Sequence, residues 1–210
     1  RHAGREIPSG IVKPALDLPA PVGIEGIAGD RHGDPVHHGG PDRALCVYPR
    51  EHLEWLAGQL GAPPGLAPCG ENLATEGLLE AEVAIGDICR IGSVVVEVSA
   101  PRNPCFLLAA RHGFRELPVE MERSGRTGFF FRILRPGLVT AGDDVVLLGR
   151  LHPRATIAEA NRLMHQDRLD REGLEAMVGV RALASSWRRT FTRRLSTGVC
   201  GDPSRRRYGD

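Results

Sequence analysis

Residues 85–99 read IGDICRIGSVVVEVS, in which two runs of β-prone residues are separated by the turn pair Gly92-Ser93. Ile and Val favour strands, and a short break containing Gly between two such runs is typical of a β-hairpin. We therefore predict that residues 88–91 and 94–99 form a hairpin. Similar runs bounded by turn residues occur at 129–134 and 145–148. Several short strands with this spacing predict a closed or nearly closed β-barrel.

Two short helical inserts are predicted between the strands, at 49–60 and 118–123. Both ranges begin with proline, which suits the first turn of a helix. With 210 residues, the chain is long enough for one good-sized core plus an appendage. We assign residues 1–150 to the β-barrel domain.

The last third of the chain has helical periodicity. Thr156 and Glu159 form a capping box, and later apolar residues recur every four positions, at Leu183, Trp187, Phe191 and Leu195. We predict a small helical bundle at 151–197 and a disordered tail at 198–210. The fold class is therefore mainly β with a C-terminal helical bundle. Residues 151–195 contain no cysteine and no glycine-rich anion loop, so we interpret the bundle as an accessory module that docks an electron donor or a second subunit, as in a homodimer. Its apolar stripe must be buried within the bundle, against the barrel or in a partner.

Cys105 lies where a thiol would be most reactive. It follows the strand at 94–99, and Asn103 and Pro104 are typical of an N-cap and a first helical residue. Cys105 is therefore predicted in the first turn of a short helix, where the helix dipole and Arg102 favour a thiolate. Such a thiolate can ligate a metal or attack a substrate. The alternative is a small buried hydrophobic residue, the commoner role of a free cysteine.

The other cysteines are predicted to be structural. Cys46 and Cys89 lie in apolar strand-like runs, Cys69 lies in a loop rich in Pro and Gly, and Cys200 lies in the polar tail. The chain has no CxxC pair, which argues against a structural zinc site. The odd number of cysteines and the absence of a signal peptide or membrane-length apolar span predict a reduced, cytoplasmic protein with no membrane partner.

Charge is distributed unevenly along the chain. Residues 1–149 carry 14 basic and 19 acidic side chains, whereas residues 150–210 carry 13 and 7. A basic C-terminal third raises the possibility of a nucleic-acid-binding module. No interleaved aromatic residues or nucleic-acid motif accompany the arginines, so we prefer a solvated helical face and do not expect nucleic acid as a partner.

Residues 29–43 form a polar loop rich in Gly and His. Neighbouring side chains at His37 and His38 diverge, which argues against chelation of one metal by both. We favour an anion-binding loop that surrounds a phosphate or another acidic ligand. The backbone amides of Gly39 and Gly40, the side chains of Arg31 and Arg43, and one histidine would bind this ligand. A simple cap on the barrel is the alternative. The loop at 69–73 is predicted to reach the same pocket through Asn72, unless that side chain only makes a turn hydrogen bond.

Taken in order, these motifs resemble the MOSC-domain family, named for the C-terminal domain of molybdenum cofactor sulfurases, and in particular its YiiM-like branch. The resemblance covers residues 9–195. The matching motifs are Gly29-Asp30-Arg31, His37-His38-Gly39-Gly40-Pro41-Asp42 leading to Tyr48-Pro49, Gly70-Glu71-Asn72-Leu73, Ile85-Gly86-Asp87, Pro101-Arg102-Asn103-Pro104-Cys105, Ser124-Gly125-Arg126-Thr127-Gly128-Phe129 and Ala158-Glu159-Ala160-Asn161-Arg162-Leu163-Met164.

The resemblance implies a MOSC-type β-barrel followed by helices, with Cys105 as the protein ligand of molybdenum in a Mo-pyranopterin cofactor. A soft metal suits a thiolate, and the cofactor phosphate suits arginines and amide-rich loops. The candidates for holding the cofactor are Arg31, Gly39, Gly40, Arg43, Asn72, Arg102 and Arg126. Pyridoxal phosphate binding, also associated with the family, is not favoured.

The implied activity is reduction of small N-hydroxylated bases, amidoximes or hydroxyurea-like compounds, with electrons from a separate donor protein. His37 or His38 would deliver protons, oriented by Asp30 or Glu71. The alternative is a non-catalytic carrier or sensor of the cofactor or of sulfur. Two departures bear on this expectation: the chain starts at Arg1 without the family's usual first strand, and Thr127 follows Arg126 where relatives commonly carry cysteine.

Overall fold

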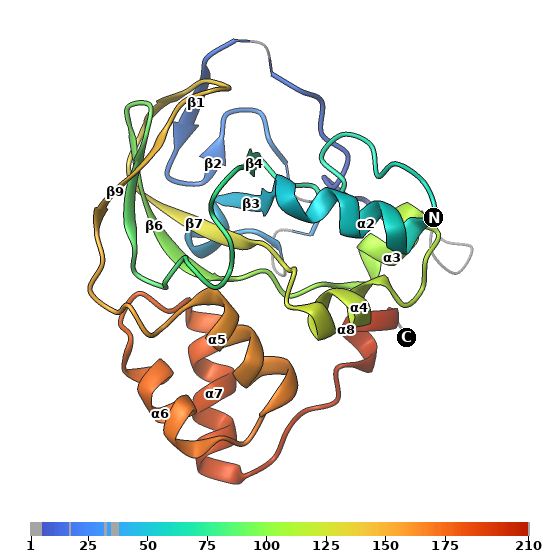
Figure 1. The fold of residues 1–210 in the computed structure, drawn as a ribbon, viewed down its shortest axis with the longest axis vertical. Coiled ribbons are helices and arrows are strands. Elements are labelled where there is room, and N and C mark those ends of the chain that lie inside the picture. The colour runs from blue at the N-terminus through green and yellow to red at the C-terminus, as the bar shows by residue number, and fades with distance from the viewer. Residues whose placement is uncertain (1–5, 17, 32, 35–37, 210) are drawn as a thin grey trace.

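The computed structural model describes residues 6–16, 18–31, 33–34 and 38–209. Its strands form two sheets that together make a half-barrel (Figure 1). The predicted β-barrel architecture is confirmed in this form. The three-stranded sheet has the order β2 (Gly26–Ile27), β1 (Ala20–Gly23), β8 (Gly137–Val139), and the six-stranded sheet has the order β4 (Leu73–Thr75), β3 (Leu45–Pro49), β7 (Phe129–Arg135), β6 (Val94–Pro101), β5 (Ile88–Ile91), β9 (Val145–Gly149).

The predicted hairpin is confirmed as β5 and β6, which pair antiparallel with Ile91 opposite Val94. β6 also pairs antiparallel with β7, whereas β3 and β4 are parallel. Alternate valines of β6, beginning with Val94, point into the core and are fully buried, as the period of two requires. Because β6 ends at Pro101, this central strand leads the chain directly to Cys105.

Both predicted helical inserts are confirmed. The first comprises the short 3₁₀ turn η2 (Arg50–His52) and α2 (Leu53–Leu60), and the second is α4 (Leu117–Ser124). Between them lies α3 (Phe106–His112), and a further 3₁₀ turn, η1 (Pro41–Arg43), precedes β3. These helices share a small hydrophobic cluster of their own, made by Tyr48, Leu56, Cys69, Leu108, Leu117 and Met121.

The C-terminal bundle consists of α5 (Ile157–Asn161), the π-helical turn η3 (Arg162–Gln166), α6 (Arg171–Gly179) and α7 (Ser185–Thr197). Thr156 caps α5, because its side chain accepts a hydrogen bond from the Glu159 amide at 3.1 Å. The predicted apolar stripe is buried: Trp187 and Phe191 belong to the same hydrophobic cluster as the sheet valines. The bundle and the half-barrel therefore share one core, so that, of the alternatives left open by the sequence, the stripe is buried against the barrel as well as within the bundle.

The tail differs from the sequence prediction. Residues 198–210 were expected to be disordered, but the structure places a short helix, α8 (Ser204–Tyr208), beside α4 (Figure 1). The cause is electrostatic: Arg206 and Arg207 of α8 form ion pairs with the buried carboxylate of Glu122 in α4. Composition predicted disorder because the segment has few apolar residues, and it could not show a distant buried charge that requires neutralising.

Many arginines of the basic C-terminal third are used inside the fold. Arg162 bonds three carboxylates, and Arg194 is buried and donates to the carbonyls of Leu163 and Met164. Arg188 donates to backbone carbonyls in the same way. These contacts explain the local basic excess without a nucleic-acid partner. In the part of the chain that the structure describes, no helix combines the length and apolarity needed to cross a membrane.

Candidate functional site

Cys105 lies at the junction of β6 and α3. It was predicted as the second residue of the helix, but the helix begins two residues later than predicted. Cys105 is the N-cap residue of α3, with extended backbone angles (φ −134°, ψ 170°), and its carbonyl accepts the Leu108 amide at 3.0 Å. Asn103 and Pro104 therefore precede the helix instead of starting it. Since Cys105 lies outside the first turn and α3 is only seven residues long, charged side chains must supply most of the positive environment of this thiol.

His38 is the side chain that approaches Cys105. Its Nε2 atom lies 3.6 Å from the Cys105 Sγ atom, within hydrogen-bond range for sulfur. The His38 amide donates to the Asp34 carbonyl at 2.9 Å, which fixes the backbone of the loop at that point. His37 lies outside the described residues. The structure thus joins His38 to the candidate thiol, and the proton delivery expected of His37 or His38 stays a prediction.

Arg43 is the cation beside this pair. Burial lowers the pKa of its guanidinium, and Asp42 opposes that effect. Cys105 raises the pKa of Arg43, whereas Arg189 lowers it. Both groups therefore lie within electrostatic reach of Arg43. The Arg43 Nη2 atom donates to the Ser186 hydroxyl at 3.4 Å. Ser186 and Arg189 belong to α7, so the helical bundle contributes side chains to the surroundings of the candidate site.

The contribution of α7 was missed by sequence reasoning. Its position depends on Asp42, which accepts the Ser185 amide at 2.9 Å and binds Arg132 at 2.6 Å. Burial opposes ionisation of Asp42, but the Ser185 amide and Arg132 outweigh it and lower its pKa. The Asp42 to Ser185 contact spans 143 positions of the chain, and the Asp42 to Arg132 contact spans 90. The Asp42 to Ser185 contact has no local sequence signal that could have revealed it.

Arg102 faces away from Cys105 in its hydrogen bonding. Its guanidinium donates to the Cys69 carbonyl and lies 3.9 Å from the Cys46 Sγ atom. The Cys69 amide in turn donates to the Glu71 carboxylate at 2.9 Å. Burial raises the pKa of that carboxyl. Arg102 therefore connects the turn between β6 and α3 to the loop at 69–73. This structural role is separate from the predicted role in cofactor binding.

Asn72 makes long-range structural contacts, not the turn hydrogen bond that the sequence offered as the alternative. Its amide nitrogen donates to Asp30 at 2.7 Å, while its carbonyl oxygen accepts the Cys46 amide at 2.9 Å. Asp30 also forms an ion pair with Lys13. The 29–43 loop, the 69–73 loop and β3 are thus fastened to one another, and this fastening brings the histidine loop over the Cys105 turn.

The remaining predicted residues lie around this centre. Arg126 stacks over the Trp55 ring at 5.3 Å, which holds its guanidinium by a cation–π contact. Gly40 is exposed and has a left-handed backbone (φ 96°), a conformation that glycine adopts without strain. Gly39 is half-buried and Arg31 is exposed. The predicted site therefore divides into a central group, in which Cys105 contacts His38 and lies within electrostatic reach of Arg43 and Arg102, and an outer group of the others.

The five cysteines are free and differ in burial. Burial raises the pKa of Cys69 to about 12 and that of Cys89 to about 11, and it also raises the pKa of Cys46. Cys105 and Cys200 are partly exposed. Within the described ranges, no three His, Cys, Asp or Glu side chains gather closely enough to hold a metal ion. Among the described residues, a metal at this site would therefore have at most two ligands of these types.

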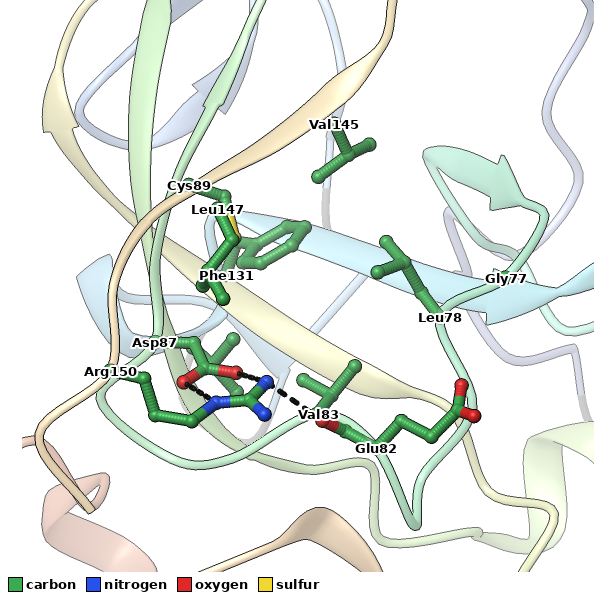
Figure 2. Close-up of a pocket in the computed structure, with 11 residues that line it drawn as sticks. Gly77, Leu78, Glu82, Val83, Asp87, Cys89, Phe131, Val145, Leu147 and Arg150 are labelled. Carbon is green, nitrogen blue, oxygen red and sulfur yellow. Dashed lines mark hydrogen bonds and ion pairs between the residues drawn. The ribbon is translucent and has the colours of Figure 1, made fainter. Parts of the chain in front are cut away.

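A cavity of about 260 Å³ lies elsewhere, inside the half-barrel (Figure 2). Its walls include Phe131, Val145 and Leu147. Its main polar groups bond to each other, because Asp87 and Arg150 form a two-pronged ion pair with contacts of 2.6 and 2.8 Å. None of the predicted site residues lines this cavity. We place the candidate site at Cys105, since the ion pair in this cavity is self-neutralised and burial raises the pKa of its thiol, Cys89, to about 11.

Comparison with known proteins identifies the family of the chain. A MOSC-domain family model matches residues 34–146, and a model of the YiiM-like 3-alpha helix domain matches residues 156–198. The chain is 38% identical over 193 residues to the uncharacterized protein YflK of Bacillus subtilis, covering 92% of this chain and 87% of YflK. It is 35% identical over 205 residues to protein YiiM of Escherichia coli, covering 96% of this chain and 91% of YiiM.

Solved structures give the same assignment. The crystal structure of YiiM from Escherichia coli matches with a TM-score of 0.84 and 34% identity, covering 92% of this chain and 93% of that chain. YiiM from Geobacillus stearothermophilus matches with a TM-score of 0.77, covering 86% of both chains. A Gibberella moniliformis protein named Reductase is 35% identical over 165 residues, which are 77% of this chain but 29% of that protein. This chain belongs to the MOSC-domain family, in its YiiM-like branch.

Proposed function

We propose that this protein is a molybdenum-cofactor-dependent oxidoreductase that reduces N-hydroxylated compounds, with the Cys105 thiolate as the protein ligand of molybdenum. The observation that carries the proposal is the contact between the partly exposed Cys105 thiol and the His38 ring, with Arg43 in electrostatic reach. Cys200 is the other partly exposed thiol, but it lies outside the MOSC match.

The residues present fit the cofactor. A single thiolate suits a soft metal whose remaining ligands come from a dithiolene. Arg43 suits an anionic group such as the cofactor phosphate. Asn103 offers a further contact, because its Oδ1 atom is buried and has no hydrogen-bond partner among the described residues. A buried orphan acceptor is costly, and an N–H group of a bound heterocycle would satisfy it.

Reduction of an N-hydroxyl group consumes two electrons and two protons, breaks the N–O bond and releases water. When bound, the cofactor supplies the two-electron chemistry. The chain's own contribution is placement and proton delivery: Cys105 anchors the metal, and His38 at 3.6 Å can hold a proton beside the reacting group. Electrons would come from a separate donor protein. The fungal relative named Reductase supports a reductive activity.

The test is metal analysis followed by an assay. The full chain is purified from a host that makes the molybdenum cofactor, and molybdenum is measured per chain. The purified protein is then incubated with an N-hydroxylated purine and, separately, with an amidoxime, with a chemically reduced electron donor. We expect near-stoichiometric metal and formation of the amine and the amidine. Bound metal without product formation would favour a carrier or sensor, and absence of molybdenum would refute the cofactor assignment.

A further inference from the structure

The C-terminal tail returns to the Cys105 turn. The Arg206 guanidinium in α8 donates through Nη1 to the carbonyl of Pro104, the residue directly before Cys105. Figure 1 shows the tail running from the end of α7 back to α8, beside α4 and the start of the α3 region. The family match to the helical domain ends at residue 198. The contact is therefore made by a segment beyond the matched helices.

Charge fixes α8 in this position. None of its residues is buried, so apolar packing contributes little. Glu122 of α4 is only 2% exposed, and its carboxylate meets Arg206 Nη1 at 2.6 Å and Arg207 Nε at 3.0 Å. A buried carboxylate needs such partners, because an isolated charge in the interior is strongly unfavourable.

Three further contacts hold the ends of the tail. The Tyr208 hydroxyl donates to Glu116 at 3.1 Å, and Arg115 lies over the Tyr208 ring at 4.8 Å. Near the start of the tail, Arg168 donates to the Gly201 carbonyl at 2.7 Å. The segment is thus attached to the bundle at one end and to the loop before α4 at the other, and Arg206 lies between the attachments.

We propose that Arg206 is a positioning residue for Cys105, and that residues 199–209 act as a clamp on the turn that carries this thiol. The peptide group between Pro104 and Cys105 is planar, so the position of the Pro104 oxygen fixes the direction of the bond that leads to the Cys105 Cα atom. Arg206 holds that oxygen and Glu122 with one guanidinium nitrogen. The buried carboxylate therefore anchors the orientation of the Cys105 side chain through Arg206.

Arg207 provides a matched comparison. It also neutralises Glu122, but its described contacts do not include Pro104. Arg206→Ala removes an ion pair from this carboxylate and Arg207→Ala removes two hydrogen bonds from it, so Arg207→Ala should lower the melting temperature at least as much as Arg206→Ala. Only Arg206→Ala releases the Pro104 carbonyl. A purely structural role of the tail would affect Arg207→Ala at least as strongly.

The experiment measures alkylation of Cys105 by iodoacetamide in the full chain, produced without the cofactor, with Cys200→Ser as background. Mass spectrometry of the labelled peptide identifies Cys105, and rates are taken across a pH series so that access and thiolate formation are separated. We expect Arg206→Ala to raise the rate at the high-pH plateau roughly fivefold over the parent, as a local opening of this kind does. Arg207→Ala should stay near the parent, and Arg206→Lys, which keeps a cationic donor, should restore the parent rate.

Equal rates in Arg206→Ala and Arg207→Ala would overturn the proposal, as would an Arg206→Lys rate no closer to the parent than that of Arg206→Ala. If Arg206→Ala does not fold, Arg206→Gln and Arg207→Gln replace the alanine pair, with the same two criteria. The inference rests on the proposed function in taking Cys105 as the functional thiol. Its failure is distinguishable, because alkylation is measured without metal, whereas the proposed function is refuted by metal analysis.

Discussion

The Nε2 atom of His38 lies 3.6 Å from the Sγ atom of Cys105, although 67 positions separate the two residues. The contact joins the polar loop before β3 to the turn after β6, and both belong to the segment matched by the MOSC domain. An imidazole at this distance can exchange a proton with the thiol and keep a proton near a group bound to the sulfur. Metal binding and proton delivery can therefore be separated by mutation.

Cys105→Ser should abolish molybdenum retention while leaving the fold intact. A serine hydroxyl is a hard, weakly acidic ligand and replaces a thiolate poorly on a soft metal. Metal content per chain checks the prediction, and circular dichroism checks the fold. Cys200→Ser is the matched control, because it removes the other partly exposed thiol and should retain the metal. Near-stoichiometric molybdenum in purified Cys105→Ser would refute the ligand assignment.

His38→Gln should lower turnover far more than metal loading. The glutamine amide can still form hydrogen bonds, but it cannot take up and release a proton as the imidazole does. Loss of a general acid commonly lowers the rate about 100-fold or more. Initial rates with a chemically reduced donor, divided by bound molybdenum, give the comparison. A parent-like rate per metal would leave the loop as a cap on the barrel. Loss of the metal itself would instead assign His38 to binding.

Much of the fold follows from short-range patterns. The hairpin of β5 and β6 was predictable because its two strands are joined by two turn residues, and α5 was predictable because Thr156 caps it locally. The sheet order was not predictable in this way, since the β3 to β4 pairing is parallel and depends on a crossover. The hydrogen-bond register of distant strands has no comparable local signal.

The residues of the candidate site could be predicted only in part, because their contacts also join distant segments. Cys105 was identified by its place between a strand and a helix, but its partner depends on how a loop 67 positions away folds over it. The approach of Ser186 to Arg43, and of Arg206 to Pro104, links segments more than 100 positions apart. The tail was expected to be disordered because composition reports apolar content, whereas the buried carboxylate that orders it lies in α4.

Arg43→Ala should weaken cofactor retention while leaving the Cys105 thiol in place. A charge-assisted hydrogen bond from a partly buried guanidinium contributes about 1.5–3 kcal/mol, so we expect loading to weaken about tenfold to a hundredfold. Molybdenum remaining after prolonged dialysis measures the effect. Ser186→Ala is the control, because it removes only the 3.4 Å contact to Arg43 and should have a much smaller effect. Equal retention in the two variants would exclude Arg43 from cofactor binding.

Glu122→Gln should remove a pH-dependent part of the protein's stability. Burial opposes ionisation of Glu122, but His165, Arg207 and Arg206 outweigh it and lower its pKa from 4.5 to about 2. A carboxyl with a depressed pKa in the folded state stabilises the protein above its unfolded pKa, and this contribution is lost as pH falls from about 4.5 to about 2. The shift corresponds to a contribution on the order of 3 kcal/mol at neutral pH.

The difference in unfolding free energy between the parent and Glu122→Gln should therefore be largest above pH 5 and shrink as the pH falls, which urea denaturation at a series of pH values can measure. The difference isolates Glu122 from the other carboxyls that titrate in the same range. Glu54→Gln, which removes an exposed carboxylate, is the control and should stay close to the parent throughout. A difference that is independent of pH would show that Arg206 and Arg207 do not stabilise the ionised form of Glu122, and that α8 is held by its other contacts.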